Sequence, residues 1–177
     1  MKNLFENVNG FNHRLKYAMK FVYELSEGEL VNSSQYKLIN KIVDTYKVAP
    51  IFLCLDKQEI VTQGQGFFEV AVPFKGTNDL FLYKPSMCSS NCPTGSLRKL
   101  PEVYIDISIG EKSVKDVQSE LDDRLEDIAK WLKWINIDAR LFNENLENKV
   151  REGIQDRVQA IKHKDYIISS IGIPLRS

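Results

Sequence analysis

Apolar side chains recur every three or four residues through the last third of the chain, from Ser113 to Ile171. This spacing places them on one face of an α-helix. No proline lies between Pro101 and Pro174, and Gly153 is the one glycine within the run. The pattern predicts a helix from Ser113 to about Ser170. Its apolar stripe consists of Val114, Val117, Leu121, Leu125, Ile128, Leu132, Ile135, Ala139, Phe142, Leu146, Val150, Ile154, Val158 and Ile161.

The helical third is compatible with one long helix or with a helical hairpin. One helix would extend about 85 Å at about 1.5 Å per residue. A domain of about 110 residues is about 30–35 Å across, so a single helix would project and need a partner. In a hairpin, the helix would be interrupted at Asn136–Asp138, at Gly153 or at His163–Asp165. The stripe keeps its phase through Ala139 and Phe142, which favours one helix, although its later four-residue steps turn it slowly around the axis.

Two shorter helices are predicted near the N-terminus. Residues from Phe11 to Leu25 carry apolar side chains at helical spacing, and Gly28 is expected to end this helix. A second helix follows the polar turn Asn32–Ser34 and ends near Lys47, because Pro50 forbids its continuation. The two form a helical pair.

The middle of the chain has the pattern of a small antiparallel sheet. Gly76–Asp79 has turn chemistry and predicts a hairpin into the strand that follows it. Ser86–Lys99 is polar and is expected to be an exposed loop. Strands are predicted at Ile51–Leu55, Glu59–Thr62, Phe67–Phe74, Leu80–Tyr83 and Glu102–Ile109.

The fold class is therefore α+β, with an N-terminal helical pair, a small antiparallel sheet of four to five strands, and a long C-terminal amphipathic helix or helical hairpin. Residues 1–112 are expected to form the α+β core. Residues 113–177 are expected to complete that core and to mediate assembly.

Charge and composition narrow the function classes. The chain of 177 residues has 24 basic and 24 acidic side chains, whereas nucleic-acid binders usually carry a basic excess. No run of 18 apolar residues is present, and the first residues lack the apolar core of a signal peptide. Three cysteines do not make a secreted disulfide framework. We expect a cytoplasmic protein with no membrane partner.

The cysteines and histidines do not follow a zinc template. Cys88 and Cys92 are separated by three residues, and only Cys54, His13 and His163 remain as further ligands. Structural zinc usually takes two closely spaced pairs. We expect a buried Cys54 and two loop thiols, with no metal and no cofactor.

Other catalytic patterns lack the right context. Gly64 and Gly66 precede a strand, whereas a phosphate-binding glycine loop opens a helix. The one Glu-x-Lys sequence, Glu147–Lys149, lies in the helical run, whereas nucleases of the restriction type need it on a strand. Asp123 and Asp127 offer a carboxylate pair, but such pairs on helix surfaces are usually only solvated. We therefore expect a protein that is not an enzyme.

Two tryptophans widen the apolar face of the long helix. Trp131 and Trp134 lie three residues apart, beside members of the stripe. One interpretation is contact with the core of the sheet. The other is an oligomer or partner interface, because aromatic residues are enriched there. The predicted interface comprises Trp131, Trp134, Leu132, Ile135, Phe142, Leu146 and Val150.

Several short motifs resemble those of an uncharacterised bacterial domain. In its longer relatives this domain precedes a restriction-endonuclease-like domain of the PD-(D/E)XK type. The resemblance covers most of residues 50–175. It rests on Leu141–Leu146, Val150–Arg157 and Ile171–Leu175, and upstream on Ala49–Leu53, Val72–Gly76 and Leu82–Ser86.

The resemblance implies a recognition, assembly or regulatory module, linked to defence against foreign DNA. The chain ends near the point where the nuclease domain would begin, so the nuclease residues have no counterpart. We expect either a shortened form or a solitary version of the longer proteins.

Three hypotheses follow. The first is a non-catalytic module that forms a homo-oligomer or binds a partner protein through the C-terminal helices. The second is a nucleic-acid-sensing module that uses the Ser86–Lys99 loop. The third, an enzyme of unrecognised type, is the least favoured, because no acid, base and nucleophile set is visible. The second hypothesis assigns the contacts to Lys84, Arg98, Lys99, Lys162 and Lys164.

Overall fold

The computed structural model describes residues 2–7, 9–64, 66–88, 91–99 and 101–171. The chain divides into two compact units. The division runs through the C-terminal helix, whereas the sequence placed a boundary at residue 113. Of the Ile171–Leu175 motif, which contributes to the resemblance, residues 172–175 lie outside the described residues. The first unit comprises Met1–Phe11 and Val48–Leu141, and the second Asn12–Lys47 and Phe142–Ser177.

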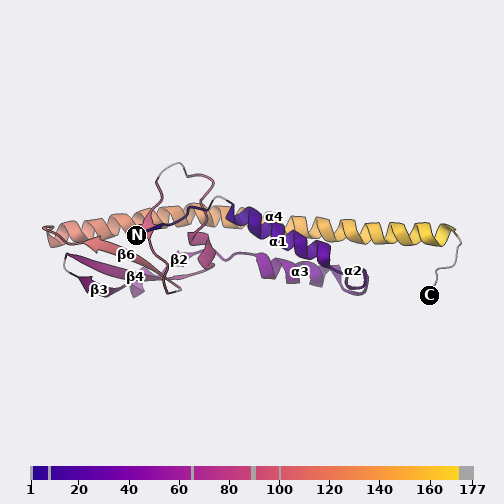
Figure 1. Ribbon diagram of the computed structural model, residues 1–177, viewed down its shortest axis with the longest axis horizontal. Helices are drawn as coiled ribbons and strands as arrows, with labels where there is room; N and C mark the ends of the chain where they lie inside the picture. The colour runs from indigo at the N-terminus through magenta and orange to yellow at the C-terminus, as the bar shows by residue number, and fades with distance from the viewer. Residues whose placement is uncertain (1, 8, 65, 89–90, 100, 172–177) are drawn as a thin grey trace. The chain divides into compact units, whose positions relative to one another are not determined.

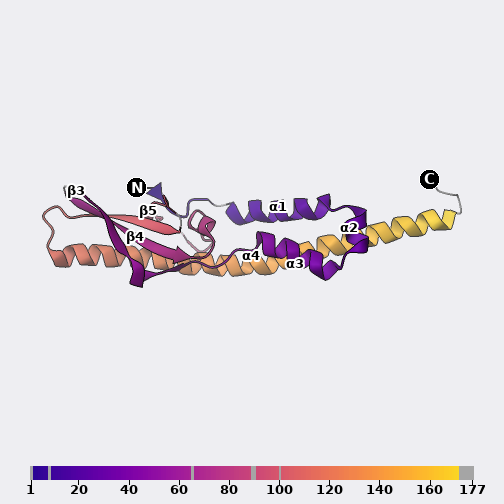
Figure 2. The same cartoon turned by 90° about the horizontal axis from the view of Figure 1, so that it is seen from below.

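The first unit is built around β4 (Phe67–Lys75), the central strand of a four-stranded antiparallel sheet. Strand β6 (Glu102–Ser108) pairs along one edge of β4. Along the other edge, β3 (Glu59–Gly64) pairs with the first part of β4, and β2 (Phe52–Leu53) pairs with its end. The first half of helix α4 (Val114–Ile171) lies along this sheet (Figures 1 and 2).

Alternation along the two longest strands produces one apolar face. Val70 and Val72 of β4 and Ile105 and Ile107 of β6 are buried on the face that α4 covers. Every stripe residue of α4 from Leu121 to Ile161 is also buried. The predicted antiparallel sheet, helical pair and long helix are thus confirmed. Of the stripe, Val114 in the first turn is 88% exposed and Val117 is half-buried.

The hairpin predicted into Leu80–Tyr83 is wrong. This segment contains the 3₁₀ helix η2 (Asn78–Phe81), in which the Leu82 amide donates to the Asp79 carbonyl at 2.9 Å. The preceding Thr77 amide donates to the Ala49 carbonyl at 3.0 Å, which directs the chain away from β4. Both Leu80 and Phe81 are fully buried. The side chains of a short apolar run can be buried by a helical turn as well as by a strand.

Three shorter elements also differ from the prediction. Ile51–Leu55 is a strand only at β2, where Phe52 is 61% exposed, and the chain then enters the 3₁₀ helix η1 (Leu55–Lys57). The predicted loop after Ser86 contains β5 (Thr94–Gly95), which pairs with β1 (Lys2–Asn3). The predicted interhelical turn contains α2 (Glu27–Asn32), which begins with a capping box of Ser26 and Glu29.

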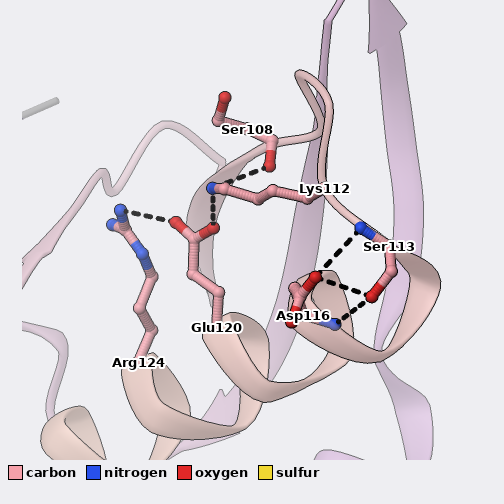
Figure 3. A network of polar contacts seen from close by, with 6 residues as sticks. All are labelled: Ser108, Lys112, Ser113, Asp116, Glu120 and Arg124. Carbon is pink, nitrogen blue, oxygen red and sulfur yellow. Dashed lines mark hydrogen bonds and ion pairs between the residues drawn. The ribbon is translucent and has the colours of Figure 1, made fainter.

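A polar network fixes the beginning of α4 (Figure 3). The Asp116 amide donates to the Ser113 hydroxyl, while the Ser113 amide donates to the Asp116 carboxylate. Hydrogen bonds from Ser113 lower the pKa of Asp116. Lys112 bonds the Glu120 carboxylate and lowers its pKa, and Arg124 bonds both Glu120 and Thr94. The turn after β6, the first turns of α4 and β5 are therefore held together.

Helix α4 continues without a break through the polar residues that the sequence suggested as a hairpin. The side-chain amide of Asn136 pairs with the backbone of Ile51, as the backbone of a neighbouring strand would. Its oxygen accepts from the Ile51 amide and its nitrogen donates to the Ile51 carbonyl, both at 2.8 Å. Asp138 accepts from the amide and the hydroxyl of Ser86, both at 2.7 Å. These side chains bond other segments and leave the helical backbone intact, so the hairpin alternative is wrong.

We expect Asn136→Ala to lower the free energy of unfolding by about 2 kcal/mol, because two backbone groups of Ile51 lose their partners. Ile51 is only 1% exposed, so water cannot easily replace the amide. Urea denaturation followed by circular dichroism measures the change. Asn145→Ala, at an exposed position of the same helix, is the matched control. Equal effects of the two substitutions would contradict the role of Asn136.

The second unit packs α1 (Gly10–Glu24) and α3 (Gln35–Tyr46) with the second half of α4. Gly153 of α4 marks a close approach, because an added Cβ would lie 2.8 Å from the Cε of Met19. Arg157 donates to the Val22 carbonyl at 2.7 Å. The buried apolar side chains of residues 12–47 are Ala18, Val22, Leu25, Leu30, Leu38, Ile39 and Ile42.

Candidate interaction surface

The structure buries six of the seven side chains predicted as an interface. The ring of Trp131 stacks on that of Phe5, with centroids 5.5 Å apart, and only 3% of Trp131 is exposed. In the folded chain these residues are therefore core, which is the first of the two interpretations that the sequence left open. The six are Trp131, Leu132, Ile135, Phe142, Leu146 and Val150.

Trp134 is the exception among these residues. It is half-buried, and its ring lies beside that of Trp131 with centroids 6.0 Å apart. The ammonium group of Lys130 lies 5.3 Å from the centre of the Trp134 ring. Three residues turn a helix by about 300°, which carries Trp134 to the flank of the buried stripe. Trp134 is thus backed by the core and open on one side.

A second, shorter apolar stripe begins at Trp134. Ile137 and Leu141 follow at the third and seventh positions, which lie on the same side of a helix. Ile137 is half-buried and Leu141 is 52% exposed. Ser86 is bonded to Asp138, the residue next to Ile137, and the residue after Ser86, Met87, is 68% exposed. We name Met87, Trp134, Ile137 and Leu141 the α4 flank patch.

Cationic side chains border the α4 flank patch. Lys130, Lys133 and Arg140 are exposed, and none forms an ion pair within the described part of the chain. Lys133 and Arg140 each lie one helical turn from Ile137. The preceding part of α4 is the opposite, with six acidic and two basic residues from Lys115 to Asp127. The helix therefore changes from an acidic to a basic surface where the patch begins.

The residues predicted to contact nucleic acid are divided between the two units, and two of them are ion-paired. Arg98 is paired with Glu69 at 2.8 Å, and Lys164 with Glu27 at 2.7 Å. Lys84 is half-buried, whereas Lys99 and Lys162 are exposed. Two of the five cations are thus already opposite carboxylates, which reduces the positive field that a phosphate backbone would meet.

A buried glutamate, Glu69, lies on the face of the sheet opposite the one that α4 covers. Glu69 of β4 lies between Thr62 of β3 and Asp106 of β6, and only 5% of its side chain is exposed. Arg98 bonds both carboxylate oxygens and also lies over the ring of Tyr104, 5.6 Å from its centre. This fork ties the segment after β5 to the sheet.

The surroundings of Glu69 raise its pKa above the ordinary value. Burial raises the pKa of the Glu69 carboxyl, and a hydrogen bond with Asp106 raises it further, against the opposing effect of Arg98. The neighbouring Tyr104 hydroxyl donates to Glu102, which raises the pKa of Tyr104. The raised pKa of Glu69 therefore reflects first its burial in the sheet and then the carboxylate beside it.

We expect Glu69→Gln to remove part of the pH dependence of stability. The native pKa of Glu69 lies above its ordinary value of 4.5, so the unfolded chain loses this proton first as pH rises. Stabilisation from the protonated form is complete below that value and is lost as pH rises through the native pKa. Glutamine stays neutral, so the variant should lack this decline.

Urea denaturation at intervals from about pH 4 to about pH 7 measures this difference. Glu59→Gln, at an exposed position of β3, is the matched control and should keep the wild-type decline. Parallel curves for Glu69→Gln and the wild type would contradict the proposed protonation of Glu69.

The thiols and imidazoles remain apart from these clusters. Burial raises the pKa of the Cys92 thiol, which donates weakly to the Phe5 carbonyl at 3.7 Å. Cys54 is half-buried, whereas the sequence predicted a buried thiol. Within the described ranges, no three His, Cys, Asp or Glu side chains gather as a metal ion would require.

Comparisons of the chain with protein-family models, curated proteins and solved structures found no significant match. Among the described residues, no helix is both long enough and apolar enough to cross a lipid bilayer.

Sequence reasoning found Trp134 but missed its neighbours in the patch. The spacing of Trp134, Ile137 and Leu141 was a detectable signal, because it forms a second helical stripe beside the stronger one. Met87 had no such signal, since its position depends on the bond between Ser86 and Asp138. The change from acidic to basic residues along the helix was also readable from the sequence.

Proposed function

We propose that this protein is a non-catalytic interaction and assembly module that binds a partner through the α4 flank patch. The observation that carries this proposal is a line of partly exposed apolar side chains on a helix whose other side is fixed in the core. Trp134 is backed by Trp131, which is itself stacked on Phe5. A rigid aromatic side chain loses little conformational entropy when a partner covers it.

The composition of the patch supports a protein contact. Tryptophan, methionine and arginine are enriched at the centres of protein interfaces. Met87 adds a flexible side chain that can adapt to the shape of a partner. The four residues form the centre of a contact, and a stable interface would extend to their polar surroundings.

The sequence resemblance supplies a context for the proposal. A module that precedes a nuclease domain in longer proteins would bring that nuclease, or a separate effector, to a partner. We include a role in defence against foreign DNA in the proposal on this resemblance alone.

Quantitative affinity purification tests the proposal. Tagged wild-type protein and the variants Trp134→Ser and Leu141→Glu are recovered from the source cells, and associated proteins are measured by mass spectrometry. Leu55→Glu is the matched control, because Leu55 is 49% exposed in η1 of the same unit and is not part of the patch. We expect a partner that the control retains and that both patch variants lose by at least about tenfold, or about 1.4 kcal/mol.

Light scattering of the purified protein measures self-association in the same set of variants. A partner or oligomer that survives both patch substitutions would overturn the proposed surface. A wild-type protein that has no specific partner and remains monomeric at high concentration would overturn the proposed function.

A further inference from the structure

We propose that the partner of the α4 flank patch is an acidic amphipathic helix of another protein. This inference rests on the proposed function and adds the chemistry of the partner. It combines the apolar line of Trp134, Ile137 and Leu141 with the unpaired cations beside it.

The apolar line indicates that the partner is a helix. Leu141 lies seven positions after Trp134, or about 10 Å along the helix axis at about 1.5 Å per residue. A partner helix meets such a line with two or three apolar side chains spaced by one turn, as in other helix-mediated recognition. Met87 follows Ser86, which bonds Asp138, and its side chain offers further exposed apolar surface.

The cations beside the patch indicate that the partner carries negative charge. Lys133 and Arg140 lie on the side of the patch away from Asp138, and Lys130 lies over the Trp134 ring. Asp138 is the one acidic residue of α4 from residue 128 to residue 141, and its carboxylate is occupied by Ser86. Glutamate or aspartate side chains beside the apolar residues of a partner would meet three positive charges and no free negative charge of this segment.

A second copy of the chain fits this surface less well. A two-fold symmetric interface places the same patch on both sides. In an antiparallel pair of helices, each flank faces its own equivalent, so Lys133 and Arg140 would approach the same cations of the other copy. Like charges at such distances are destabilising. A different protein with acidic residues avoids this repulsion.

A nucleic acid also fits less well. Single-stranded nucleic acids bind through bases stacked on exposed aromatic faces. The ammonium group of Lys130 lies over the Trp134 ring, in the position that a stacking base would take. Ile137, Leu141 and Met87 offer aliphatic surface, which is suited to apolar side chains.

Peptide titration tests the inference. The probes are a synthetic helix with leucine along one side and glutamate elsewhere, the same peptide with lysine in place of glutamate, and an acidic peptide with the same composition in scrambled order. Each is titrated into the full chain by isothermal calorimetry at low salt. We expect the first peptide to bind at least about tenfold more tightly than the other two, or about 1.4 kcal/mol.

Variants locate the binding site. The double variant Lys133→Glu and Arg140→Glu should weaken the acidic peptide by at least tenfold, and Trp134→Ser should do the same. Lys115→Glu, a charge reversal at an exposed lysine of the acidic part of α4, is the matched control and should change binding little. Circular dichroism confirms that each variant is folded.

The outcomes separate the inference from the proposed function. Equal binding of the acidic and basic helices, lost in Trp134→Ser, would overturn the acidic partner and leave the interaction surface standing. Self-association lost in the patch variants, or tighter binding of a single-stranded oligonucleotide at this site, would also overturn the acidic partner. Absence of peptide binding overturns the inference, and the proposed function falls with it only if purification also finds no patch-dependent partner.

Discussion

Replacing Trp131 with alanine is expected to lower the free energy of unfolding by about 3–5 kcal/mol, the range for truncating a large buried aromatic side chain. The side chain is 3% exposed and stacks on Phe5, which is itself fully buried and adjoins Phe81. Alanine would leave a cavity where the N-terminal segment meets α4. Urea denaturation monitored by circular dichroism measures the loss.

Trp134→Ala is the matched control for this experiment. The two residues lie three positions apart on one helix, and their rings are in contact. Because Trp134 is half-buried, we expect a loss of about 1 kcal/mol from its lost contacts. Equal losses at the two positions would contradict the distinction between a core tryptophan and a surface tryptophan, on which the proposed function depends.

Leu146→Ala is expected to destabilise the protein by about 2–5 kcal/mol, as buried leucine truncations do. Leu146 is fully buried in the second unit, although the sequence placed it in an interface. The substitution removes contacts from the core and leaves a cavity beside neighbours such as Val150. Thermal and urea denaturation both report the loss.

The same substitution at Leu141 provides the comparison. Leu141 is 52% exposed, and we expect Leu141→Ala to change the free energy of unfolding by less than about 0.5 kcal/mol, as surface substitutions usually do. If Leu146→Ala were tolerated as well as Leu141→Ala, then Leu146 would not be a core residue.

Periodicity predicted the helical framework and most of its core. From Leu121 to Ile161 the stripe of α4 is buried at every predicted position, because a regular apolar spacing has one simple explanation over forty residues. The first member, Val114, lies in the opening turn and is exposed. Such end effects depend on what surrounds the turn.

Tertiary partners explain the local errors. Asn136 and Asp138 suggested a break in the long helix, because burying a polar side chain costs free energy unless it has hydrogen-bond partners. Ile51 and Ser86 supply those partners, and neither is near them in sequence. Leu80 belongs to a short apolar run of the kind that is typical of strands. It lies instead in a buried 3₁₀ turn, which is held by hydrogen bonds to a distant segment.

The candidate surface was only partly predictable. The sequence showed that two tryptophans widen the apolar face, but it did not show which of them points into the core. That choice depends on Phe5, whose ring stacks on Trp131 from the other end of the first unit's sequence. Similarly, the raised pKa of Glu69 had no signal in the sequence, because Asp106 and Arg98 reach Glu69 through strand register and a loop.

Site-specific photo-crosslinking tests the central claim most directly. A benzophenone amino acid is placed at Leu141 in the patch, or at Ala129, which is exposed elsewhere on the same helix. After irradiation in the source cells, the account predicts one discrete adduct from Leu141, none from Ala129, and loss of the adduct when Trp134→Ser is added. Equal adducts from both positions, or an adduct that persists with Trp134→Ser, would contradict an interaction surface at the α4 flank patch.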